Sequence, residues 1–407
     1  MKINKVTFKN RDGVELSGRL ELPASATTQA YALFAHCFTC TKNLKSVHDI
    51  SAALGQNGIA VFAFDFTGLG ESEGDFADTN FSSSVNDLID AAKFLQSEYQ
   101  APAILIGHSL GGTAAIRAAL EIPSVLAVAT IGAPFCPAHV KNLFADDIDS
   151  IRADGETQVH IGGRSFRIRR QFLDDINGQS VESALRNLKR ALLVFHSPLD
   201  NVVGIENATD IFQAAKHPRS FISLDHADHM LSRTEDSTFA GQLLAAWARR
   251  YIRLDELEQQ NEFRTEHQVA VRTGESYTTD VLSGNHRLVA DEPASVGGND
   301  FGPSPYGYLQ AALGSCTAIT IRMYANRKEW PLKEVRVHLN HNKVHAKDCA
   351  DCDTPGGKID ELERHIELIG DLSDEQRSRL LEIADKCPVH KTLHSEIKVR
   401  TFLEDRQ

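Results

Sequence analysis

Short apolar runs alternate with helix-length segments through the first part of the chain. The apolar runs are continuous, which is typical of strands buried on both faces, and they cover residues 31–36, 59–65, 103–108, 125–131, 191–196 and 220–225. Segments long enough for helices lie between them, among them 44–57, 84–98 and 110–121. This alternation predicts an α/β fold with a doubly wound, mostly parallel sheet. Two earlier strands, near 3–9 and 14–22, are expected to pair antiparallel at one edge.

The pattern changes after a charged stretch, and we place a domain boundary near residue 258, which gives domains 1–257 and 258–407. The expected elements of the second domain are β-structure over 268–290, a helix over 305–326, a strand over 333–345, a helix over 373–386 and a last strand over 395–403. The first of these helices is apolar nearly all round, so we expect it to be buried. The second opens with Ser373 and Gln376 at capping-box spacing. This predicts a C-terminal α+β domain.

A long insertion, about residues 135–190, separates two strands of the predicted sheet. Inside it, a run of alternating residues predicts a β-hairpin that turns at Gly162–Gly163. The insertion follows the carboxyl end of a strand, so it is either a lid over a site or a surface decoration.

The composition excludes several classes of protein. The chain has 407 residues, of which 42% are apolar and 24% charged, as in a soluble globular protein. Its net charge of −12 argues against nucleic acid or an anionic membrane as the main partner. No run approaches the roughly 18 apolar residues of a membrane span, and the first ten residues lack the apolar core of a signal peptide. We therefore expect a cytoplasmic protein whose seven cysteines are reduced.

A pentapeptide in the first domain indicates a catalytic serine. Gly107-His108-Ser109-Leu110-Gly111 lies between a predicted strand and a predicted helix. The G-x-S-x-G spacing permits a sharp turn that lifts the serine hydroxyl above the sheet. Ser109 is the predicted nucleophile. The alternative is that Ser109 only forms part of the turn and that the protein is inactive.

A serine nucleophile needs a base, and the base needs a carboxylate that orients it. Asp200 follows one predicted strand and is the expected orienter, and His229 follows the next and is the expected base. His226 remains the alternative base, because spacing does not separate two histidines three residues apart. Asp225 and Asp228 compete with Asp200 but lie on the histidine loop itself.

The backbone N–H groups of Phe38 and Leu110 are the expected oxyanion hole. Together these motifs resemble those of the α/β-hydrolase family, over roughly residues 1–252. The resemblance implies a Ser109–His229–Asp200 triad that acts on an ester, thioester or amide of a small-molecule acyl substrate. The family usually has glycine after the histidine of the oxyanion loop, where this chain has Cys37.

Cys37 and Cys40 form a C-x-x-C on the same loop. We interpret them as two incidental thiols, with redox chemistry as the alternative, because the motif does not lie in a thioredoxin-like unit. Cys136 is interpreted as an ordinary buried thiol.

Two cysteines of the second domain occur in helical contexts. Cys316 lies within the apolar helix, and Cys387 shares a helix face with apolar residues, so both are expected to point inward. The segments GGNDFGPSPYGYLQAALGSCTAITIRMYA and KCPVHKTL resemble the OsmC family, over roughly 265–403. The resemblance implies that Cys316 is a peroxidatic thiol and Cys387 its resolving partner. It also implies a homodimer with sites at the subunit interface, which reduces organic hydroperoxides with a thiol reductant and without a metal.

The second domain departs from the family at one position. Tyr306 stands where active members carry glutamate, and the stabilising cation is expected to be Arg272 or, as an alternative, Arg287. The alternative function is therefore a hydrolase alone, whose OsmC-like domain is a non-catalytic dimerisation, metal-binding or redox-sensing module.

A second group of residues has ligand chemistry. His341, His345, Cys349 and Cys352 together are a set that zinc favours, but their spacing is loose. Solvent-facing histidines with free thiols, or extra redox thiols, are the competing interpretations. We expect no metal and no cofactor.

Overall fold

The computed structural model describes residues 2–23, 28–252, 266–274, 276–345 and 358–403. The chain divides into two compact units, Met1–Leu288 and Val289–Gln407. The boundary expected near residue 258 lies outside the described residues.

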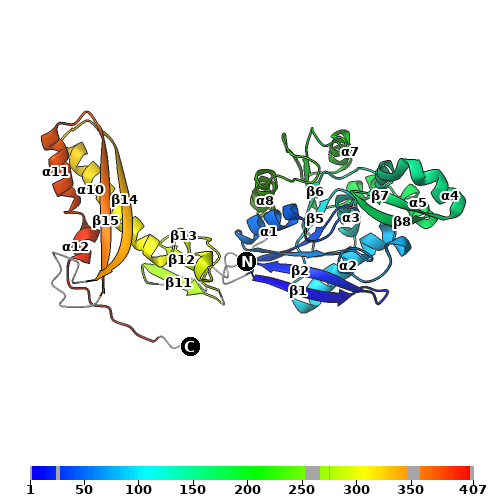
Figure 1. The fold of residues 1–407 in the computed structure, drawn as a ribbon, viewed down its shortest axis with the longest axis horizontal. Helices are drawn as coiled ribbons and strands as arrows, with labels where there is room; N and C mark the ends of the chain where they lie inside the picture. The colour runs from blue at the N-terminus through cyan, green and yellow to red at the C-terminus, as the bar shows by residue number, and fades with distance from the viewer. Residues whose placement is uncertain (1, 24–27, 253–265, 275, 346–357, 404–407) are drawn as a thin grey trace. The chain divides into compact units, whose positions relative to one another are not determined.

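An eight-stranded sheet forms the centre of the first unit, in the order β1-β2-β4-β3-β5-β6-β9-β10. Figure 1 labels β1, β2, β5 and β6 of this sheet. Six strands run parallel: β3 (Ala30–Ala35), β4 (Ile59–Phe64), β5 (Ile104–His108), β6 (Ala127–Ile131), β9 (Ala191–His196) and β10 (Arg219–Ser223). At one edge, β1 (Lys2–Lys9) and β2 (Glu15–Leu22) pair antiparallel. The predicted doubly wound sheet and its antiparallel edge are confirmed.

Helices cover both faces of this sheet, which is why its central strands are apolar at every position. In β3, Leu33 and Ala35 face the core under α2 (Phe81–Glu98) and α3 (Leu110–Ala118). Ala32 and Phe34 face the opposite core, under α1 (Lys45–Gly55) and α8 (Thr234–Ala248). The helix α7 (Glu206–Ala214) joins the first of these cores. The strand β10 lies at an edge and is only partly buried.

The insertion folds as a substructure of its own. Its elements are η2 (Pro137–Asp147), α4 (Ile148–Asp154), β7 (Glu156–Ile161), β8 (Arg164–Arg169), α5 (Arg170–Asn177) and α6 (Glu182–Asn187). The predicted hairpin is confirmed, with Gly162 and Gly163 at φ +57° and +77°, where a side chain would be strained. Asp175 fixes the insertion to the sheet layer, because it accepts hydrogen bonds from the backbone N–H and hydroxyl of Ser82 in α2.

The second unit is built on an antiparallel pair, β14 (Leu332–His345) and β15 (Lys358–Gly370). The helices α10 (Pro305–Arg327), α11 (Asp374–Ala384) and α12 (Pro388–Leu393) accompany this pair. A separate sheet contains β11 (Val269–Thr273) and β12 (Thr279–Ser283), which belong to the first unit, and β13 (His286–Ala290), within which the division between the units falls. Short turns of helix are η1 (Phe76–Asp78) in the first unit and η3 (Ala294–Val296) in the second. The capping box of Ser373 and Gln376 is confirmed at the start of α11, whereas β15 was not predicted.

Two expectations for this unit are wrong. The helix α10 buries only the face that carries Leu313, Thr317 and Ile321, while Met323 is 67% exposed, because one chain supplies neighbours on one side of it only. Residues 395–403 form no strand, and Val399 is 85% exposed. A strand needs a neighbour for its backbone groups, and no described strand lies beside this segment.

None of the helices in the described ranges is long and apolar enough to cross a lipid bilayer.

Candidate active site

The carboxyl ends of the parallel strands carry the residues predicted to act in catalysis. Ser109 follows β5, Asp200 follows β9, and His229 follows β10. A cavity of about 450 Å³ at this edge is lined by Ser109, Leu110, His229 and Phe38, among others. Both Ser109 and His229 are buried, at 9% and 8% exposure, so the serine hydroxyl and the imidazole face this cavity rather than bulk solvent.

Close packing forces the turn that contains Ser109. Its φ of +54° is rare for a residue with a side chain. A Cβ on Gly107 would lie 2.3 Å from the carbonyl oxygen of Gly111, and a Cβ on Gly111 would lie 2.4 Å from that of His36. Only glycine fits at these two positions. The backbone N–H of Ser109 donates to the carbonyl of Ile131 on the next strand, which fixes the turn.

Asp200 and His229 form the best-defined contact of the cavity. The Nδ1 of His229 donates to Oδ2 of Asp200 at 2.7 Å, which leaves Nε2 with its lone pair. Burial acts to raise the pKa of Asp200, but the hydrogen bond from His229 and those from the N–H groups of Val202 and Val203 outweigh it, so this pKa is lowered. The aspartate therefore stays ionised beside the imidazole.

The competing residues lie elsewhere on the same loop. His226 and Asp225 are exposed, and Asp225 accepts a hydrogen bond from Ser223. Asp228 accepts from the backbone N–H of Ser232. No hydrogen bond joins Ser109 to His229 among the described residues; such bonds often tighten only when substrate is bound.

His108 is a further buried residue of the site, and sequence reasoning gave it no role. Its Nε2 donates to the backbone carbonyl of His229 at 2.7 Å, so it holds the loop that carries the expected base. Burial, followed by repulsion from His229, lowers the pKa of His108 to about 4. The sequence offered one signal for such a role, because His108 directly precedes Ser109 in the pentapeptide.

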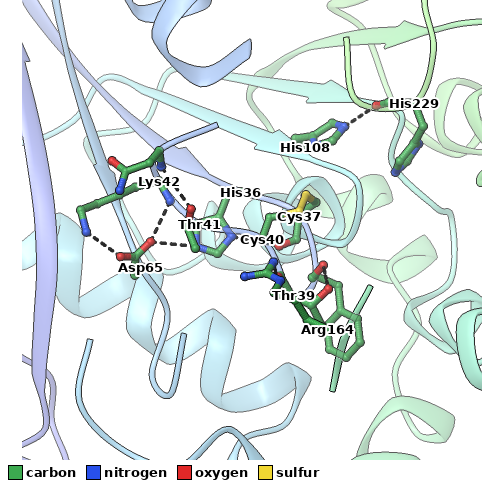
Figure 2. Close-up of a disulfide and its surroundings, with 12 residues drawn as sticks. His36, Cys37, Thr39, Cys40, Thr41, Lys42, Asp65, His108, Arg164 and His229 are labelled. Atoms are coloured by element: carbon green, nitrogen blue, oxygen red, sulfur yellow. Dashed lines mark hydrogen bonds and ion pairs between the residues drawn. A yellow bond between two sulfur atoms is a disulfide. The ribbon is translucent and has the colours of Figure 1, made fainter. Parts of the chain in front are cut away.

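The loop after β3, which is expected to carry part of the oxyanion hole and is called the oxyanion loop below, contains a disulfide. This corrects the expectation that all cysteines are reduced. Cys37 and Cys40 are bonded (Figure 2). The backbone turns here, with the N–H of Cys40 donating to the carbonyl of Cys37, and this brings the two Cα atoms to 5.3 Å, a usual spacing for a disulfide. Cys136 is exposed rather than buried, because it lies where the chain leaves the core after β6.

A buried ion pair lies beside the disulfide (Figure 2). Lys42, 2% exposed, places its Nζ 2.5 Å from Oδ2 of Asp65, which is fully buried. Asp65 also accepts from the backbone N–H groups of Lys42 and Glu71, and Glu71 accepts from the Lys42 ammonium. Removing one member of a buried pair costs about 3–5 kcal/mol, so these residues anchor the loop firmly.

The insertion forms part of the cavity wall. His139, Val140, Leu143, Ile161 and Arg164 line the cavity from the insertion side. Most of these side chains are apolar, whereas the guanidinium of Arg164 reaches the carbonyl of Thr39 on the oxyanion loop. The insertion thus borders the reacting edge of the sheet, as a lid would.

The second unit holds its two expected thiols in different environments. Cys387 is fully buried at the start of α12, where its sulfur accepts from the N–H of His390 at 3.3 Å. Cys316 is partly exposed on α10, so the inward orientation expected for both residues holds only for Cys387. Both thiols are free. The hydroxyl of Thr317, the residue after Cys316, lies 3.7 Å from the Cys387 sulfur.

A guanidinium that sequence reasoning missed is one hydroxyl away from Cys387. Arg364 on β15 donates to the hydroxyl of Thr317 at 2.8 Å and to the carboxylate of Asp385 at 2.6 Å. Arg272, the expected cation, forms an ion pair with Asp280 between neighbouring strands. Tyr306, at the position where glutamate was expected, stacks on the ring of His341.

No cluster of three or more ligating side chains is placed to hold a metal in the described ranges. His341 pairs with Asp360 at 2.9 Å. Cys349, Cys352 and the side chain of His345 lie outside what the structure describes.

Comparison with known proteins gives a family for each part of the chain. The family described as serine aminopeptidase, S33, matches residues 35–151, and the family described as OsmC-like protein matches residues 297–402. The esterase domain of a Rhodothermus marinus protein is 50% identical in sequence, with a TM-score of 0.52, and the match covers 62% of this chain and 99% of that domain. This chain belongs to the α/β-hydrolase family and carries an OsmC-like domain.

More distant relatives match the hydrolase domain only in part. The uncharacterized protein YfhR of Salmonella typhi is 22% identical over 226 residues, which are 55% of this chain and 74% of YfhR. The monoglyceride lipase of Rattus norvegicus is 32% identical over 117 residues, which are 28% of this chain and 38% of the lipase. The hydrolase domain is thus similar in sequence to part of a lipase and, over its whole length, to an esterase domain.

His108 makes the stability of the hydrolase domain depend on pH. An unfolded histidine takes up a proton near pH 6.5, whereas folded His108 takes one up only near pH 4. The free energy of unfolding therefore falls as the pH drops through this window, by about 3 kcal/mol from this residue. We expect His108→Gln, which keeps an N–H donor for the His229 carbonyl, to reduce that fall by the same amount.

The measurement is urea unfolding at pH 7 and pH 4, followed by Trp247 fluorescence in a Trp330→Phe background. His160→Gln is the matched control, because His160 is exposed. Equal pH dependence in His108→Gln and the parent protein would contradict this assignment.

Proposed function

We propose that the hydrolase domain cleaves esters by a Ser109–His229–Asp200 mechanism. The Nε2 of His229 takes the proton of Ser109 as Oγ attacks the substrate carbonyl, and returns it to the leaving alcohol. The N–H groups of Phe38 and Leu110 stabilise the oxyanion, and water then releases the acyl group from Ser109. The observation that carries this proposal is the Asp200–His229 hydrogen bond at the wall of the cavity that Ser109 also lines.

The cavity favours esters with an apolar acyl group. Its walls include the apolar residues Leu44, Val140, Leu143, Ile161 and Val203, and the guanidinium of Arg164 in the same lining is engaged with the Thr39 carbonyl. A volume of about 450 Å³ lies within the usual range for small-molecule sites. Thioesters and amides are the weaker candidates.

The triad predicts a contrast between neighbouring residues. We expect His229→Ala and Asp200→Asn each to lower kcat for p-nitrophenyl butyrate by about 10⁴-fold. The first substitution removes the base, and the second removes the carboxylate that fixes the tautomer of the base. His226→Ala and Asp225→Asn, on exposed positions of the same loop, are the matched controls and are expected to keep kcat within about twofold. A large loss in either control, with activity retained in the first pair, would overturn the assignment.

We also propose that the OsmC-like domain reduces organic hydroperoxides. The Cys316 thiolate attacks the peroxide, which leaves a sulfenic acid on Cys316 and releases an alcohol. Cys387 then displaces water from the sulfenic acid to form a disulfide, and an external dithiol reduces this bond. Arg364 supports the proposal because it bonds to the Thr317 hydroxyl, which lies 3.7 Å from the Cys387 sulfur, and we assign it the cationic role at this thiol pair that was first expected of Arg272.

The second candidate for this domain is a non-catalytic module. Tyr306, stacked on His341 and 46% exposed, favours it, because active family members carry a carboxylate there. The module would then serve only dimerisation, metal binding or redox sensing, and the hydrolase would be the one enzyme of the chain.

Peroxide treatment separates these candidates. We expect one equivalent of cumene hydroperoxide to form a Cys316–Cys387 disulfide in the reduced protein within seconds, as seen by mass spectrometry after alkylation. Arg364→Gln is expected to slow this at least tenfold, because the thiolate loses a cation. Exposed Cys136 is the internal control and stays reduced. If Cys316 and Cys387 stay reduced as well, the domain is a module without peroxidase activity.

We propose a homodimer formed through the OsmC-like domain. Ile319 and Met323 are 59% and 67% exposed on one apolar helix, α10, and Val399 and Phe402 are exposed in the segment expected to be a strand. Such surfaces favour burial against a second copy.

The dimer predicts a mass change on substitution. Light scattering of the full chain is expected to give a molar mass twice that of one chain. Replacing Ile319 and Met323 by aspartate would place two charges in the apolar contact and yield a monomer. Phe239→Asp is the control, at an exposed apolar position of the hydrolase domain. A wild-type monomer contradicts the proposal.

A further inference from the structure

The Cys37–Cys40 disulfide brackets the backbone that we assign to the oxyanion hole. It closes the loop between β3 and α1 around Phe38 and Thr39 (Figure 2). The ring of Phe38 packs against Phe76 and Phe172, with centroids 5.5 and 5.3 Å away. Its backbone is therefore held by ring packing on one side and by the disulfide on the other.

Thr39 shows why this loop needs a constraint. Its φ of +63° lies in the left-handed region, which a β-branched residue rarely adopts. The conformation is held by the Cys40 N–H on the Cys37 carbonyl, by the guanidinium of Arg164 on the Thr39 carbonyl, and by the Cys37–Cys40 bond. The bond is the covalent member of this set and joins the residues on either side of the strained position.

A small reductant can reach the disulfide through the substrate cavity. Cys37 and Cys40 both line the cavity that Ser109 and His229 share. Cys37 is 4% exposed, whereas Cys40 is partly exposed, so we expect attack at Cys40 Sγ. The disulfide and the serine nucleophile thus face the same space.

We propose that Cys37–Cys40 is a redox modification site, which takes small dithiols and controls the oxyanion loop of the hydrolase. This inference rests on the proposed ester hydrolysis. A dithiol thiolate attacks Cys40 Sγ, the S–S bond breaks, and Cys37 leaves as a thiolate that takes up a proton. The second thiol of the same dithiol then attacks the dithiol sulfur that is bound to Cys40. This releases Cys40 as a thiolate, which also takes up a proton. The protein gains two electrons and two protons, and the dithiol becomes a cyclic disulfide.

Reduction removes the covalent constraint across Thr39, which then relaxes away from its left-handed conformation. The Phe38 N–H moves with it and no longer points at the oxyanion. An oxyanion donor acts chiefly in the transition state, so its loss lowers kcat by about 10²–10³-fold and changes KM little. The oxidised enzyme is the active form.

The test equilibrates the full chain in buffers of reduced and oxidised dithiothreitol. At each ratio, kcat and KM for p-nitrophenyl butyrate are measured, and the alkylated fraction of Cys37 and Cys40 is read by mass spectrometry. We expect kcat to fall at least tenfold in step with alkylation of this pair, with KM within about twofold, and to recover on reoxidation. Cys136→Ser is the control and titrates like the wild type. Recovery on reoxidation separates loop relaxation from unfolding.

Two further arms sharpen the test. Cys37→Ala/Cys40→Ala is expected to have the low kcat at every ratio. A phosphonate bound to Ser109 is expected to slow reduction of the pair, because it fills the shared cavity. Constant kcat while the pair becomes alkylated, or wild-type kcat in the double variant, overturns this inference alone. An oxidised wild type that neither hydrolyses ester nor labels at Ser109 overturns the proposed function, and this inference with it.

Discussion

Parallel strand pairing is the constraint on which the arrangement of this site depends. Because β3, β5, β6, β9 and β10 run in one direction, all their carboxyl ends open onto the same edge. Ser109 and His229 are far apart in the chain and reach one cavity only through this pairing, which also brings Asp200 to His229. Each strand interior needs only to be apolar, so the chemistry is confined to the first few residues after each strand.

Strained backbone conformations, which cost free energy, occur at that edge of the sheet. Ser109 and Thr39 both have positive φ. Close backbone packing at Gly107 and Gly111 holds the turn at Ser109, whereas hydrogen bonds and the Cys37–Cys40 disulfide hold Thr39. The Lys42–Asp65 pair beside the disulfide holds the far end of the oxyanion loop, and a buried pair of this kind tolerates no loss of one partner. The sheet therefore provides rigidity, and the local strain is stored where a backbone N–H or a hydroxyl must be aimed.

Patterns that depend on one element were predicted well from sequence, and those that depend on a partner were not. Continuous apolar runs identified the central strands, and the paired glycines identified the hairpin at 162–163. The sequence showed that α10 is apolar on most of its surface. It did not show whether residues of the same chain or of another chain cover that surface. The segment 395–403 failed for the same reason, because a strand exists only beside another strand.

The missed site residues share a different cause. Arg364 lies on β15, where charged and apolar residues alternate, so nothing distinguishes it from a solvated cation until Thr317 is seen beside it. The Cys37–Cys40 bond was missed because the state of all cysteines was inferred from the expected cellular compartment of the protein. Bonding of this pair follows instead from a local turn that brings the two residues together.

The two thiol systems place opposite demands on a shared reductant. In the proposed peroxidase, a dithiol must keep Cys316 and Cys387 reduced for turnover to continue. In the proposed switch, the same dithiol opens Cys37–Cys40 and relaxes the oxyanion loop. One supply of reducing equivalents would then favour peroxide reduction and silence ester hydrolysis, and its exhaustion by hydroperoxide would reverse both. Because one chain carries both domains in equal amounts, the reductant alone would set which of the two proposed reactions runs.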